Sequence, residues 1–112
     1  MITKEINICK KQVMVAYCFA TEIGFMTFTG QPIDTMETTN PEHIIYLILA
    51  AIHAYYQKDS KDSPVKDEDL MYDATPEELY DAIKEIMNLR GEWYKTLLGD
   101  KQDKPAGKEK NA

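Results

Sequence analysis

The sequence predicts an all-α fold, a small bundle of three main helices with a short helical turn between the second and the third. Residues 10–28 are apolar almost all round at helical period, which is typical of the central helix of a bundle. Two further stretches, residues 41–58 and 76–98, follow helical periodicity and begin with capping signals. A chain of 112 residues is long enough for one hydrophobic core, so residues 1–98 form a single predicted domain.

The N-terminal segment before the first helix has a different pattern. Residues 3–8, TKEINI, alternate polar and apolar side chains, which fits either a short edge strand or an extended arm. The first predicted helix then covers residues 10–28, with Glu22 as the one charge in its interior. We expect Gly30 to end this helix, because glycine adopts the left-handed conformation found after many helix C-termini.

The second predicted helix begins at residue 41. Asn40 is suited to cap it, and Pro41 falls at the first helical position, where the missing N–H costs nothing. Residues 59–69, DSKDSPVKDED, follow it and contain Val65 as their one aliphatic residue. A charged segment with so little to bury predicts a mobile surface loop. The short helical turn is expected just after it, at residues 68–74.

A capping box marks the start of the third predicted helix. The Thr75 hydroxyl and the Glu78 carboxylate each satisfy one unpaired backbone N–H at this end, with Pro76 between them. The helix is expected to continue to residue 98. Residues 99–112, GDKQDKPAGKEKNA, show no hydrophobic periodicity, so they are predicted to be a disordered, charged tail.

Composition restricts the classes of partner. A net charge of -6 argues against nonspecific nucleic-acid binding and against docking on anionic lipid, since both require lysine and arginine in excess. A protein partner fits better.

The longest apolar run, IIYLILAAI, is far shorter than the ~20 residues that span a bilayer, and the N-terminal residues lack the apolar core of a signal peptide. The sequence therefore predicts a cytoplasmic protein without a membrane span.

A search for catalytic or metal-binding patterns gives mostly negative results. His43 and His53 lie nearly three turns apart on one predicted helix, and neither belongs to an HExxH motif. Cys9 and Cys18 lack CxxC spacing and are expected to be free thiols. We therefore predict no catalytic residue, no metal site and no cofactor.

The third predicted helix has an apolar arc of about 180°, wider than the ~100° stripe that one core requires. The part expected to face inward is Leu79, Ile83, Ile86, Trp93 and Leu97. The remaining flank, predicted to bind a partner or to support self-association, is Tyr80, Met87, Tyr94 and Leu98. The alternative is that the first helix covers both parts, which would make the flank part of the core.

Arg90 lies near the centre of this apolar arc. An arginine there can stack on Trp93 or pair with a carboxylate from another helix, and Glu22 is the one acidic side chain within the apolar first helix. We predict a partly buried ion pair between Arg90 and Glu22 that fixes the register of the two helices. The competing interpretation is a partner-facing arginine at the rim of an apolar groove.

Three stretches together resemble a known family: AYCFATEIGFMTFTGQPI, NPEHIIYLILAAIHAYY and LMYDATPEELYDAIKEIMNLRGEWY, followed by a charged tail. Over residues 10–98 the chain resembles the small tail assembly chaperones of long-tailed phages, as carried by prophages of Bacteroides-type bacteria. The resemblance implies a non-enzymatic, helical protein of the host cytoplasm. It also implies a partner, the tape measure protein, whose hydrophobic helices the chaperone coats until tail tube polymerises around them.

Two alternatives from other classes remain open at the level of sequence. One is a structural virion component such as a head-tail connector, which would form a stable ring and stay in the finished particle. The other is a small-molecule enzyme with a site around Arg90, His43 and His53, which requires a deep polar pocket and perturbed histidines.

Overall fold

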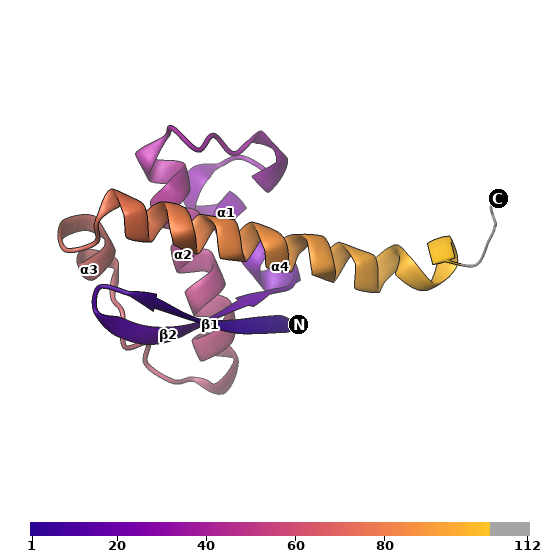
Figure 1. Cartoon of the computed structure of the whole chain (residues 1–112), viewed down its shortest axis with the longest axis horizontal. Helices are drawn as coiled ribbons and strands as arrows, with labels where there is room; N and C mark the ends of the chain where they lie inside the picture. The colour runs from indigo at the N-terminus through magenta and orange to yellow at the C-terminus, as the bar shows by residue number, and fades with distance from the viewer. Residues whose placement is uncertain (104–112) are drawn as a thin grey trace.

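The fold is mixed α/β, so the all-α prediction is wrong: a two-stranded antiparallel sheet packs against the helices. The computed structural model describes the backbone of residues 1–103 and the side chains of residues 1–98. In chain order the main elements are β1 (Ile2–Ile8), β2 (Lys11–Tyr17), α1 (Phe19–Thr29), α2 (Pro41–Tyr56), α3 (Asp67–Tyr72) and α4 (Pro76–Asp103). Short 3-10 turns occur at Ile33–Thr35 and Gln57–Asp59. Figure 1 shows α4 as the long helix that crosses the molecule, with the hairpin and α2 beside it.

The N-terminal hairpin replaces the first part of the predicted central helix. Strand β1 confirms the strand interpretation of residues 3–8, and β2 occupies residues that the sequence assigned to helix. Cys9 and Lys10 connect the strands, and both have positive φ, 54° and 61°, as a two-residue type I′ turn requires. Neither is glycine or asparagine, so the usual sequence signal for such a turn is missing.

One face of the hairpin joins the core. The register pairs Ile6 with Val13 and Ile2 with Tyr17, which places these side chains on the same face of the sheet. Val13, Val15 and Tyr17 are buried at alternate positions, the period of a strand rather than of a helix. Helix α2 packs against β2, and α4 packs against both strands.

Helix α1 is short and lies at the periphery, not at the centre of a bundle. It covers eleven residues and packs one face against α2. Phe25 is fully buried on that face, and a Cβ added to Gly24 would lie 3.2 Å from the Ala50 Cβ, so the glycine allows the two helices to approach closely. Gly30 ends the helix in the left-handed conformation, φ 75°, as the sequence predicts.

Helix α2 forms the centre of the core. The Asn40 side chain accepts hydrogen bonds from the backbone N–H groups of Glu42 and His43, and Pro41 occupies the first helical position, so the predicted start is confirmed. The helix ends at Tyr56, two residues before the predicted end. Its fully or almost fully buried apolar residues are Ile44, Leu47, Ile48, Leu49, Ala50, Ala51 and Ile52.

The segment after α2 is anchored rather than loose. Val65, the one aliphatic residue of the predicted mobile loop, is 1 % exposed and belongs to the hydrophobic core. The Ser63 hydroxyl closes a local turn by accepting from the Val65 N–H and donating to the Val65 carbonyl. Helix α3 then begins at Asp67, within the predicted loop, and buries Leu70. The buried Val65 side chain and the Ser63 hydrogen bonds therefore hold in place a segment whose composition predicts a mobile loop.

The capping box that begins α4 is confirmed. The Glu78 carboxylate accepts from the Thr75 N–H at 3.0 Å, and the Thr75 hydroxyl accepts from the Glu78 N–H at 3.2 Å. Helix α4 continues to Asp103, past Gly99, where the sequence predicted the disordered tail to begin. The rest of that predicted tail, residues 104–112, lies outside the described residues.

Within the described residues, none of the helices combines the length and the apolar character that crossing a bilayer requires.

Candidate functional site

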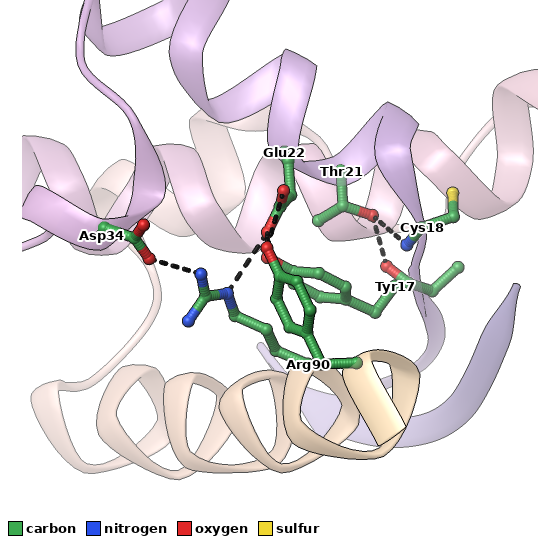
Figure 2. A network of polar contacts seen from close by, with 8 residues as sticks. Tyr17, Cys18, Thr21, Glu22, Asp34 and Arg90 are labelled. Atoms are coloured by element: carbon green, nitrogen blue, oxygen red, sulfur yellow. Dashed lines mark hydrogen bonds and ion pairs between the residues drawn. The ribbon is translucent and has the colours of Figure 1, made fainter. Parts of the chain in front are cut away.

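A polar cluster around Glu22 joins α1 to β2, α4 and the turn after α1 (Figure 2). The predicted contact between Arg90 and Glu22 is present: the Arg90 Nε donates to Glu22 Oε2 at 3.2 Å. Both side chains are partly buried, with exposed fractions of 19 % and 20 %. Arg90 also donates through Nη2 to Oδ1 of Asp34, a second carboxylate that sequence reasoning missed.

The Glu22 carboxylate is the acceptor at the centre of this cluster. Its Oε2 accepts from the Tyr17 hydroxyl at 2.9 Å and from the Tyr94 hydroxyl at 3.0 Å, in addition to Arg90. The Arg90 guanidinium carbon lies 4.8 Å from the centre of the Tyr94 ring, so the cation stacks on Tyr94 and not on Trp93 as the sequence suggested. These three donors replace hydrogen bonds to water that the partly buried carboxylate has lost.

The strand-to-helix junction positions Glu22. The Thr21 side chain is fully buried, donates to the Ala16 carbonyl at 2.8 Å and accepts from the Cys18 N–H at 3.3 Å (Figure 2). These bonds fix the direction in which α1 leaves β2. Glu22, the next residue, consequently points at α4, while Phe25, one turn later, points into the core.

Burial and hydrogen bonding in this cluster shift the pKa values of Tyr17, Tyr94 and Arg90. Burial, with the hydrogen bond to Glu22, raises the pKa of Tyr17 well above its ordinary value, and the same causes raise the pKa of Tyr94. Although burial alone opposes its charge, Arg90 has a raised pKa because Asp34 and Glu22 bind its protonated form. None of these shifts brings a group towards neutral pH, so the cluster is arranged to hold segments together rather than to transfer protons.

We expect the stability of the protein to fall with rising pH above about pH 10, where an unfolded tyrosine ionises. Because the folded-state pKa of Tyr17 is raised, the folded protein retains a proton that the unfolded chain loses. This one group should lower the free energy of unfolding by about 1.4 kcal/mol per pH unit in that range. Urea unfolding at increasing pH measures the slope. Tyr17→Phe should reduce it, and an unchanged slope in that variant would contradict the assignment.

The predicted binding flank of the third helix is not one continuous surface. Tyr80 and Leu98 are exposed, but they lie at opposite ends of α4. Met87 and Tyr94 are half-buried against the core, and the Tyr94 hydroxyl is bound to Glu22. Of the residues expected to face inward, Leu97 is instead 45 % exposed. Substituting both half-buried residues, as in Met87→Asp with Tyr94→Asp, would therefore disturb the fold as well as any binding.

An uncovered apolar surface lies on α1. Phe19, Ile23 and Met26 occupy one side of this helix at spacings of four and three residues, and their exposed fractions are 61 %, 58 % and 46 %. The opposite side, with Thr21 and Phe25, is buried. We call Phe19, Ile23 and Met26 the α1 face. Sequence reasoning missed it because residues 10–28 were assigned to a fully covered helix.

The residues of the candidate enzyme site have separate structural roles. His43 is buried, its Nδ1 accepts from the Glu37 N–H at 3.0 Å, and its ring packs edge-on against Phe25. The His53 ring lies against Phe28, and its Nε2 is 4.0 Å from a carboxylate oxygen of Asp67. The side chains that contact Arg90 are Glu22, Asp34 and Tyr94, and none of these is among the partners of the two histidines.

Neither a thiol pair nor a metal-binding cluster is present in the described part of the chain. Cys9 and Cys18 are free, as the sequence predicts. No group of three histidine, cysteine or acidic side chains within the described residues is arranged to hold a metal ion.

Comparison of the chain with protein-family models, with curated proteins and with solved structures finds no match.

Proposed function

We propose that the protein is a phage tail assembly chaperone, which binds hydrophobic helices of the tape measure protein before tail tube polymerises. The observation that carries this proposal is the α1 face, a row of three large apolar side chains on a helix that covers the core with its other side. A row with this spacing is suited to pack against a second helix, as helix-in-groove complexes do. The resemblance of residues 10–98 to such chaperones identifies the partner.

The size of the α1 face suits a reversible complex. Fully burying a large apolar side chain contributes roughly 1.5–3 kcal/mol, and each of the three residues is already about half covered, so each adds roughly 1 kcal/mol. Binding also costs translational and rotational freedom. A single α1 face therefore binds weakly, and tight coating of a long helical protein requires many copies side by side. Weak individual contacts also allow release when the tube assembles.

The double variant Ile23→Glu with Met26→Lys should abolish capture of tape measure fragments and leave the fold intact. Both side chains are exposed, and the two new charges leave the net charge at -6. A charged pair on the α1 face would have to be desolvated in the complex, at a cost larger than the contact gains. Co-expression with the tape measure fragment, followed by affinity pulldown, measures capture, and circular dichroism measures folding.

A matched control places the same two residue types elsewhere. Asn88→Glu with Thr96→Lys alters exposed positions of α4 and also conserves the net charge. This control should capture the fragment as the wild-type protein does. Capture by the α1-face variant at the wild-type level would contradict the proposal. A stable ring that persists in purified virions would instead support the head-tail connector alternative.

A further inference from the structure

A second apolar surface lies between the first half of α2, α3 and the start of α4. It is a hollow of about 440 Å³, within the size range of ligand-binding clefts. No charged residue lines it. Its lining consists of Thr39, Pro41, Ile44, Ile45, Leu70, Met71, Ala74, Pro76, Leu79 and Tyr80.

The hollow continues along α2 into a smaller one of about 260 Å³. The two share Pro41, Ile45 and Met71, and the smaller one adds Glu42 and Tyr46. Together they form an elongated groove, which we call the α2–α4 groove. A compact small molecule is usually oriented by several converging polar groups. Here the side-chain hydroxyls of the larger hollow are those of Thr39 and Tyr80 alone, so the shape and lining favour a segment of polypeptide.

Several acidic residues adjoin the lining of this groove in the sequence, and one of them, Glu42, lines the smaller hollow. Residues 12–57 and 67–83, which include every residue of its lining, contain no lysine or arginine. No lysine or arginine therefore directly precedes or follows a residue lining the larger hollow, whereas six acids do. These acids are Glu42, Asp69, Asp73, Glu77, Glu78 and Asp81.

Two of these six carboxylates already have partners. Asp69 accepts from the Lys66 N–H and from Lys11, and Glu78 accepts from the N–H groups of Thr75 and Cys9. The backbone hydrogen bonds are the main cause of the lowered pKa of both groups. The remaining four are exposed and form no ion pair with another described residue: Glu42, Asp73, Glu77 and Asp81.

We propose that the α2–α4 groove binds a segment of a partner protein in which large apolar side chains are flanked by lysine or arginine. The apolar residues would enter the groove, and the flanking cations would meet the free carboxylates at its rim. This goes beyond the chaperone proposal, because it assigns a second surface with a charge requirement and holds whichever protein supplies the segment. The α1 face lacks such a rim, since Glu22, its one acidic neighbour in sequence, is bound to Arg90.

The test uses two labelled peptides with the same apolar helical core, one with lysine pairs at both ends and one with glutamate pairs. Fluorescence anisotropy with the full chain measures their affinities. The lysine-flanked peptide should bind about tenfold or more tightly than the other at low ionic strength, and the difference should shrink as salt is added. Equal affinities, or no binding of either peptide, would overturn the proposal.

A pair of charge-reversal variants locates the binding surface. Glu42→Lys with Glu77→Lys changes the rim, and Asp62→Lys with Glu92→Lys makes the same change in net charge at exposed positions that line neither hollow. The rim variant should bind the lysine-flanked peptide about tenfold more weakly, and the control should stay within about twofold. Circular dichroism checks that both remain folded. Similar losses in both variants would show a nonspecific charge effect and overturn the proposal.

The α1-face variant, Ile23→Glu with Met26→Lys, separates this inference from the proposed function. It should bind the lysine-flanked peptide as well as the wild-type protein does. If it loses the peptide and the rim variant retains it, the peptide binds on α1 and the groove has no part in binding. If the rim variant alone loses the peptide, the inference is supported, whatever the outcome for tape measure capture.

Discussion

Glu22→Leu is expected to lower the free energy of unfolding by ~3–5 kcal/mol, the usual cost of breaking a buried ion pair from one side. The substitution removes the acceptor of three donors at once. Tyr17 is fully buried, so its hydroxyl would be left without a partner, and Arg90 would retain one carboxylate, the exposed Asp34. Urea unfolding followed by far-ultraviolet circular dichroism measures the change.

A double-mutant cycle tests whether Glu22 and Arg90 act as a pair. Arg90→Met should cost less, about 2–3 kcal/mol, because Glu22 keeps the hydroxyls of Tyr17 and Tyr94. Combining it with Glu22→Gln removes both charges and preserves an acceptor for the hydroxyls, so much of the loss should be recovered. Combining Arg90→Met with Glu22→Leu would instead leave the Tyr17 hydroxyl without its acceptor. Additive losses in the glutamine cycle would show that the two charges do not interact.

Trp93→Ala should also lower the free energy of unfolding by ~3–5 kcal/mol, the range seen when a large buried aromatic ring is removed. Trp93 is 5 % exposed, and its ring centre lies 4.7 Å from that of Phe19 and 5.4 Å from that of Tyr17. It therefore joins the last buried turn of α4 to both the hairpin and α1. Urea unfolding at pH 7 measures the loss.

The conservative control for this site is Trp93→Phe. Phenylalanine fills part of the space and keeps an aromatic contact with Tyr17, so its cost should be well below that of alanine. Because the α1 face begins at Phe19, which packs on Trp93, the alanine variant should also weaken capture of tape measure fragments. Equal stability of the alanine and wild-type proteins would show that α4 is held without this ring.

The features that could be predicted from the sequence are those fixed by a few neighbouring residues. Asn40 with Pro41, and Thr75 with Glu78, satisfy backbone groups within one turn, so the two helix starts follow from local chemistry. Gly30 ends α1 for a similarly local reason, its left-handed backbone. The contact of Arg90 with Glu22 was also predictable, because each is an isolated charge in an apolar pattern and burial requires a counter-ion.

The features that could not be predicted depend on contacts between distant segments. Residues 13–17, VMVAY, are all apolar, so a helical and a strand period fit them equally well, and the Cys9–Lys10 turn gives no glycine or asparagine signal. Once β2 takes the residues before Phe19, α1 becomes a short peripheral helix with an uncovered face. Asp34 reaches Arg90 because of the path of the turn after α1. The residues next to Asp34 in the sequence do not indicate this contact.

The absence of lysine and arginine from residues 12–57 has a consequence for proteolysis. Trypsin cleaves after these two residue types, so it has no site in α1 or α2 and none after the first residue of β2. The α1 face is therefore resistant to this protease even in an unfolded chain. The fragment from residue 12 to Lys58 should appear as one large peptide after complete digestion. In a complex with a partner that contains lysine, trypsin would cut the exposed sites of the partner but none within residues 12–57, so the protected partner sites map the bound segment.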